Sequence, residues 1–124
     1  MYQYGSVSGA LTVSPNENVQ FPSSETILNT LRENLSTDAA SWIDFIEFEP
    51  YTGAFYVAYE GEGNVYEGDL LDNVQEAVRF IKNKYGSVDY GLLEVFTDDS
   101  IQFGLILVYL NEAVFRAVDE DEIF

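Results

Sequence analysis

WIDFIEFEPYTGAFYVAYEGEGNVYEGD, residues Trp42–Asp69, is the stretch that decides the fold. It predicts two strands, 42–49 and 54–60, because both segments are rich in β-branched and aromatic residues. The Pro-Tyr-Thr-Gly segment at 50–53 separates the runs and is typical of a tight turn. The stretch therefore predicts a β-hairpin that ends in an acidic, glycine-rich segment.

The two strands of this hairpin differ in their alternation. In the second strand, three apolar residues share one face: Phe55, Val57 and Tyr59. In the first strand Asp44 shares parity with Ile46 and Phe48, so a regular strand would place a carboxylate among core residues. We therefore expect a β-bulge near Phe45 to Glu47 that shifts the register by one residue.

Helical and strand patterns flank the hairpin on both sides. Before the hairpin we expect a strand (3–13), a loop (14–22), a helix (24–35) capped by Ser23 or Ser24, and a connector (36–41) that is long enough for an extra helical turn. After the hairpin we expect a glycine-rich acidic loop (Gly61–Gly68) and a helix that is capped by Asp69 and ends at Tyr85-Gly86. Strands are expected at 90–97, 102–110 and 113–118.

This order predicts an α+β fold with a single antiparallel sheet and two helices on one face. The arrangement expected is a ferredoxin-like βαββαβ core with added C-terminal strands. Residues 1–118 would form one domain, followed by an acidic C-terminal tail at 119–124. The second face of the sheet would be open to solvent unless something covers it.

The composition limits the chemistry. The chain has 124 residues and a formal net charge of −17. Hydrophobic residues make up 47% of it and aromatic residues 15%, a composition that is too apolar for a disordered acidic protein. Cysteine and histidine are absent, so disulfides, the usual zinc ligand sets, thiol nucleophiles and imidazole catalysis are excluded. The N-terminal residues show no signal-peptide pattern and no apolar run could span a bilayer, which predicts a cytoplasmic protein.

The acidic residues are concentrated in the middle of the chain. Between Arg32 and Arg79 there are eleven Asp or Glu residues and no Lys or Arg. Such a surface repels nucleic acid and anionic membranes and complements a basic protein surface. The candidate partner-binding residues are Asp44, Glu47, Glu49, Glu60, Glu62, Glu67, Asp69, Glu94 and Asp98.

Several other readings of these residues are open. A catalytic carboxylate pair needs a pocket that shifts one pKa, and with twenty-two acids adjacent pairs arise by chance. The loop at 60–69 offers oxygen ligands for calcium but lacks EF-hand spacing, and it lacks the Lys of a phosphate-binding loop. The nine tyrosines would need a basic groove to stack nucleic-acid bases, so they fit a core or a protein interface better. A solvated surface that serves solubility is the remaining alternative.

Two resemblances add to this reading. GSVSGALTVSP (5–15), VQEAVRFIKNKYG (74–86) and YGLLEVFTDDSIQFGLILVYLNEAV (90–114) resemble small uncharacterised proteins of phages and actinobacteria. The small size, single domain and charge of −17 are similar in physical type to phage DNA-mimic inhibitors of restriction or CRISPR systems.

The sequence thus leads to two hypotheses about function. In the first, an acidic non-enzymatic inhibitor mimics nucleic acid and blocks the basic nucleic-acid-binding groove of a host defence protein, of the anti-CRISPR or anti-restriction type, in the host cytoplasm if phage-encoded. In the second, a structural or adaptor domain assembles through its sheet face and the charge serves solubility. Neither hypothesis requires a cofactor or a metal, and the chain would be a monomer or a homodimer.

Overall fold

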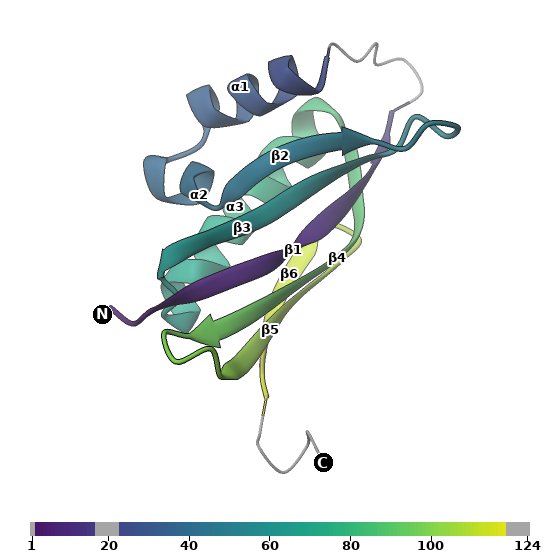
Figure 1. Cartoon of the computed structure of the whole chain (residues 1–124). Coiled ribbons are helices and arrows are strands. Elements are labelled where there is room, and N and C mark those ends of the chain that lie inside the picture. Colours follow the sequence, from purple (N-terminus) through teal and green to yellow (C-terminus); the bar gives the residue numbers. More distant parts are fainter. Residues whose placement is uncertain (1, 17–22, 119–124) are drawn as a thin grey trace.

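The computed structural model describes residues 2–16 and 23–118, which form one sheet and three helices (Figure 1). The strands are β1 (Tyr4–Pro15), β2 (Ile43–Phe48), β3 (Phe55–Asn64), β4 (Gly86–Thr97), β5 (Gln102–Tyr109) and β6 (Glu112–Ala117). The helices are α1 (Ser24–Asn34), α2 (Thr37–Ser41) and α3 (Glu67–Lys84). The predicted α+β class and the single antiparallel sheet are confirmed.

The six strands follow the order β2-β3-β1-β4-β5-β6, and every neighbouring pair is antiparallel. The long first strand therefore lies inside the sheet, between β3 and β4. Strands β2 and β6 form the two edges. The connector after α1 forms the third helix, α2, whose first turn is capped by the Ser36 hydroxyl accepting from the Ala39 amide at 3.2 Å.

One hydrophobic core lies between the sheet and the helices. Ile27 and Leu31 of α1 and Val74 and Ile81 of α3 are fully buried together with one face of the sheet. Residues at alternate positions of the central strands complete this core: Val7, Leu11, Val13, Phe55, Val57, Tyr59, Val88, Leu93, Val95, Ile106 and Val108. All three helices thus cover the same face, which we call the helix face of the sheet, and the opposite face is the open face.

The β-bulge predicted in β2 is present, slightly closer to the N-terminus than expected. The register with β3 shifts between Ile43, which pairs with Tyr59, and Phe45, which pairs with Ala58. The extra residue is Asp44, which is exposed. Ile43 can therefore join the core while Phe45 projects from the open face, and no carboxylate is buried.

The prediction of a loop at Gly61–Gly68 is wrong, because most of these residues belong to β3 and α3. Strand β3 continues to Asn64, and its two glycines lie against the indole of Trp42. A Cβ on Gly63 would lie 3.3 Å from a ring carbon, which is a tight contact, whereas the 3.4 Å at Gly61 is an ordinary one. Asp69 does not cap the following helix. Helix α3 begins at Glu67 after Tyr66, and Asp69 lies within its first turn.

The prediction that a loop begins at residue 14 is also wrong. Strand β1 continues to Pro15 because Ser14 and Pro15 pair with Ser87 and Gly86, the start of a β4 strand longer than expected. Residues 17–22 of that loop, and the acidic tail at 119–124, lie outside the described residues. Of the helices in the described ranges, none combines the length and apolar character that a bilayer crossing requires.

Candidate partner-binding face

The open face carries an unbroken apolar row across all six strands. The strand registers align Phe45 (β2), Ala58 (β3), Ala10 (β1), Leu92 (β4), Leu107 (β5) and Val114 (β6). Phe45 is 47% exposed and Val114 is 54% exposed, while the residues between them are partly exposed. Adjacent strands lie about 4.8 Å apart, so this row spans roughly 24 Å.

A second row, two residues further along each strand, is aromatic at its centre and acidic at its ends. It consists of Glu47, Tyr56, Thr12, Tyr90, Tyr109 and Glu112, again one residue from each strand. Tyr90 and Tyr109 are 54% and 69% exposed. Together the two rows form a contiguous apolar and aromatic surface, which on soluble proteins commonly marks a protein interaction site.

A glutamate row borders the other side of the apolar row. Glu60 and Glu94 lie on either side of Ser8, because Ser8 pairs with both. Their Cα atoms are therefore about 10 Å apart. The row continues through Leu105 to Arg116 at the β6 edge. Glu62 lies one step further along β3, opposite Ser6.

The structure brings together four of the nine acidic residues predicted to bind a partner. Glu47, Glu60, Glu62 and Glu94 are exposed and share the open face. Glu47 borders the apolar row on one side, Glu60 and Glu94 border it on the opposite side, and Glu62 lies one step beyond Glu60. The open face therefore has an apolar centre and an acidic rim.

The other five predicted residues lie elsewhere. Asp44 occupies the bulge at the β2 edge, and Asp98 lies in the turn between β4 and β5. Glu49 closes the β2–β3 turn by accepting from the Thr52 amide at 2.9 Å. Glu67 and Asp69 begin α3, on the helix side of the molecule.

One acid of the open face is held by a tyrosine. The Tyr4 hydroxyl donates to Glu62 Oε2 at 2.6 Å. This hydrogen bond to a carboxylate is the main cause that raises the pKa of Tyr4, with smaller contributions from desolvation and from the charges of Glu62 and Asp98. The hydrogen bond links Glu62, near the end of β3, to the first residue of β1.

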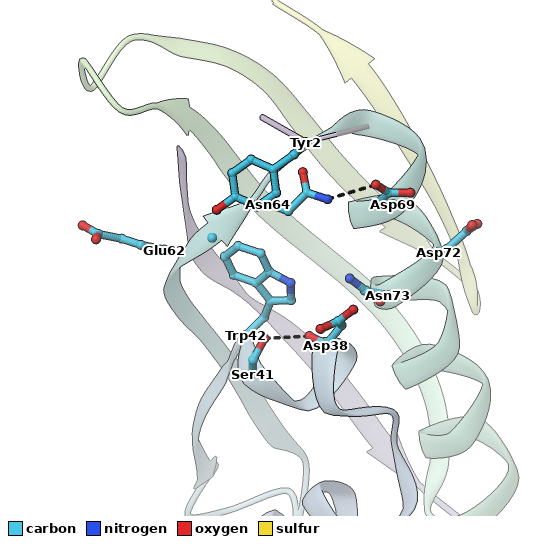
Figure 2. Close-up of a pocket in the computed structure, with 10 residues that line it drawn as sticks. Tyr2, Asp38, Ser41, Trp42, Glu62, Asn64, Asp69, Asp72 and Asn73 are labelled. Atoms are coloured by element: carbon cyan, nitrogen blue, oxygen red, sulfur yellow. Dashed lines mark hydrogen bonds between the residues drawn. The ribbon is translucent and has the colours of Figure 1, made fainter. Parts of the chain in front are cut away.

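A separate acidic pocket lies on the helix side, between α2, the end of β3 and the start of α3 (Figure 2). Its volume is about 630 Å³, and its carboxylates are Asp38, Glu62, Asp69 and Asp72. The Trp42 indole lies at its centre in Figure 2, whereas Glu62 extends away from the other acids. Asn64 Nδ2 donates to Asp69 at 2.9 Å and joins β3 to α3.

The side chains at these sites offer negative charge and apolar contact area. Negative potential in the helix-side pocket opposes phosphates and other anions. Within residues 2–16 and 23–118, no cluster of three carboxylates is placed to hold a metal ion. The open face offers tyrosine and aliphatic surface with carboxylates around it, a composition found at protein interfaces.

Sequence reasoning missed the apolar and tyrosine rows of the open face. Their signal was present in β4 and β5, where residues of both parities are apolar: Leu92 and Leu93 are adjacent, as are Ile106 and Leu107. A strand with one solvated face normally alternates apolar and polar residues. The loss of that alternation could have indicated that both faces make contacts.

A comparison with protein-family models, with curated proteins and with solved structures finds no match to this chain.

Proposed function

We propose that this chain is a non-enzymatic protein-binding module that docks its open face on a partner protein with an apolar patch bordered by Lys and Arg. The observation that carries the proposal is the apolar row from Phe45 to Val114 with glutamates on both sides. Aromatic and aliphatic side chains would supply the contact area, and the acidic rim would select a basic partner and speed association.

Charge complementarity argues against a second copy as the occupant of this face. A face-to-face pair would bring two sets of open-face carboxylates, including Glu47, Glu60, Glu62, Glu94 and Glu112, against each other. Like charges brought together at an interface cost several kcal/mol. A basic partner would replace this repulsion by attraction.

The test is capture of partners from a cell lysate by the immobilised chain, compared between charge-matched variants. Glu60→Lys, Glu62→Lys and Glu94→Lys together reverse the charge of the glutamate rim. A control triple, Glu25→Lys, Glu33→Lys and Asp72→Lys, makes the same change in net charge on exposed helix positions. We expect the amount of protein captured by the rim variant to be at least about tenfold lower than with the wild type, because attraction to the basic partner becomes repulsion.

The control triple should retain capture near the wild-type level. Equal loss in both variants would show that net charge alone holds the partner, and retention in the rim variant would show that the open face is not the site. A third variant, Leu107→Ser, leaves the charge unchanged and should also weaken capture, because it interrupts the apolar row. Far-UV circular dichroism verifies that each variant is folded.

Nucleic-acid mimicry is the second candidate function. It is supported by the acids at one end of the open face, Glu60, Glu62 and Glu94, together with Asp98 of the adjacent turn. These could complement the Lys and Arg residues of a nucleic-acid-binding groove in a defence protein of the restriction or CRISPR type. Mimicry requires that rising salt releases the partner and that duplex DNA competes for it, whereas apolar docking resists salt.

We also infer that β2-β3-β1-β4 and their helices form a ferredoxin-like core. The support is that β1 lies between β3 and β4, and that a helical connection links β1 to β2 and another links β3 to β4. Strands β5 and β6 would then be an extension that widens the open face by two strands.

A further inference from the structure

Strand β6 is an edge strand with a regular backbone. In the described part of the chain it is hydrogen-bonded on one side only, to β5, with six consecutive pairs and no register shift. It contains no proline and no bulge, two devices that commonly protect sheet edges. The other edge, β2, is interrupted by its bulge at Asp44.

The hydrogen-bond pattern shows which groups of β6 face outward. The Val118 amide donates to the Phe103 carbonyl at 2.9 Å, one position beyond the Gly104–Ala117 pair. Because bonding alternates along an antiparallel pair, the even-numbered residues of β6 bond to β5. The odd-numbered residues, Ala113, Phe115 and Ala117, direct their amide and carbonyl groups to the free edge.

We propose that β6 pairs antiparallel with β6 of a second copy, about a two-fold axis at Val114. In this register Glu112 lies opposite Arg116 of the second copy, and Arg116 lies opposite its Glu112. On the helix face, Ala113 lies opposite Phe115 in the same reciprocal way, so a small side chain meets a large one. The edge is thus complementary to itself in charge and in size.

Other registers lose this match. Only odd-numbered residues have outward backbone groups, so an odd-numbered residue must pair with an odd-numbered residue of the second copy. The residue numbers of a pair, which add up to 228 in the register centred on Val114, can therefore change their sum only in steps of two. A pair centred on Glu112 or on Arg116 would oppose like charges, and a pair centred on Phe115 would oppose two phenyl rings and leave Glu112 without Arg116. Only the register centred on Val114 pairs both charges. Glu112 and Arg116 would form non-hydrogen-bonded pairs, in which side chains approach most closely.

Among the described residues, basic side chains gather near β6. The chain has five basic residues, and Arg116 lies on β6 while Arg79 and Lys82 line a pocket of about 340 Å³ with Glu112 and Ala113. These cations reduce the local repulsion between two copies that each carry a net charge of −17.

One side chain now occupies part of the edge. Gln75 of α3 accepts from the Ala113 amide at 2.9 Å and donates to the Asn111 carbonyl at 3.2 Å, as a neighbouring strand would. The Phe115 amide and the Ala113 carbonyl are not held by Gln75, and they can form two inter-copy bonds directly. The two bonds that use the Ala113 amide require Gln75 to move aside, which exchanges one hydrogen bond for another.

Dimerisation would join the two open faces without covering them. The apolar row that ends at Val114 would continue through Val114 of the second copy, so that twelve strands share one row. The inference is independent of the proposed function, since it uses the edge of the sheet and leaves the open face accessible.

The experiment is sedimentation equilibrium of the full chain across a wide range of protein concentrations. Glu112→Arg and Arg116→Glu each create two like-charge contacts, and each should weaken the dimer roughly tenfold. The double variant, Glu112→Arg with Arg116→Glu, restores both pairs and should return the dissociation constant to near the wild-type value. Gln75→Ala removes the competitor at the edge and should tighten the dimer.

A matched control uses the same substitution types away from β6: Glu60→Arg on β3 and Arg32→Glu on α1, which should change the dissociation constant far less. Amide hydrogen exchange gives a second readout, in which protection of Phe115 should rise with protein concentration. A wild-type chain that stays monomeric, single variants that dimerise as well as the wild type, or a double variant without recovery would each overturn the proposal.

Discussion

The two faces of the sheet are built from the same strands but differ in what covers them. On the helix face, alternate residues such as Leu11, Leu93 and Ile106 are fully buried under α1 and α3. On the open face, the intervening residues Ala10, Leu92 and Leu107 are also apolar, yet they remain partly exposed. The helix face supplies stability, whereas the open face retains apolar surface that a partner can still bury.

The largest expected difference between the faces comes from two adjacent leucines. Leu93→Ala on the helix face should lower the free energy of unfolding by about 3 kcal/mol, because it leaves a cavity in the core. Leu92→Ala on the open face should lower it by less than about 1 kcal/mol, because little buried contact is lost. Urea unfolding followed by circular dichroism measures both values. Similar losses in the two variants would mean that the open face is packed as tightly as the core.

Much of the fold follows from local sequence signals. The apolar alternation in β1 and β3, the Ser23 cap of α1 and the conflict that required a bulge in β2 are visible in the chain itself. The boundaries that failed depend on contacts between distant residues. Gly61 and Gly63 are typical of a loop in sequence, but they are strand residues that pair with β1 and lie against Trp42.

The candidate site was less accessible to prediction than the fold. The sequence shows which residues are acidic, but the face that each one occupies depends on the strand registers of the whole sheet. Glu60 and Glu94 are neighbours only because both pair with Ser8 of β1. Glu67 and Asp69, in contrast, lie apart from these glutamates because they belong to the first turn of α3, on the helix side. The apolar row depends on five strand registers together, and its local signal is confined to β4 and β5, where apolar residues occupy both faces.

Tyrosines on the two faces provide a second, smaller difference. The Tyr59 hydroxyl is buried in the helix-face core and has no hydrogen-bond partner within the described residues. Tyr59→Phe should therefore raise the free energy of unfolding by about 1 kcal/mol at neutral pH, since an unsatisfied buried hydroxyl is removed. Tyr51→Phe, at a position that is 94% exposed, is the control and should leave it nearly unchanged. A destabilised Tyr59→Phe variant would reveal a partner for the hydroxyl.

The same residue gives a pH dependence. Burial, reinforced by the charge of Glu76, raises the pKa of Tyr59 above its ordinary value of 10.0. The folded state therefore keeps the phenol proton under conditions where the unfolded state releases it. The contribution of Tyr59 to stability is complete below pH 10 and falls as the pH rises above that value. The advantage of Tyr59→Phe over the wild type should consequently grow above pH 10 in the same urea experiment.

The smallest expected effect concerns charge on the two sides of the molecule. Two unit charges 10 Å apart in water repel by about 0.4 kcal/mol without salt, so Glu94→Gln should raise the free energy of unfolding by at most a few tenths of a kcal/mol by relieving repulsion from Glu60. Glu25→Gln makes the same chemical change in the first turn of α1, where the helix dipole favours a negative charge. That variant should lose a few tenths instead.

The sign of this difference, and its decline with salt, distinguish repulsion on the open face from a general effect of net charge. Both substitutions remove one negative charge, so a response to net charge alone would stabilise both variants equally. Opposite signs at low salt that converge at high salt would instead show that the acids on the open face are held together against their mutual repulsion. A cluster maintained in this way is relieved when a basic partner binds, whereas the Glu25 carboxylate is already stabilised within its own helix.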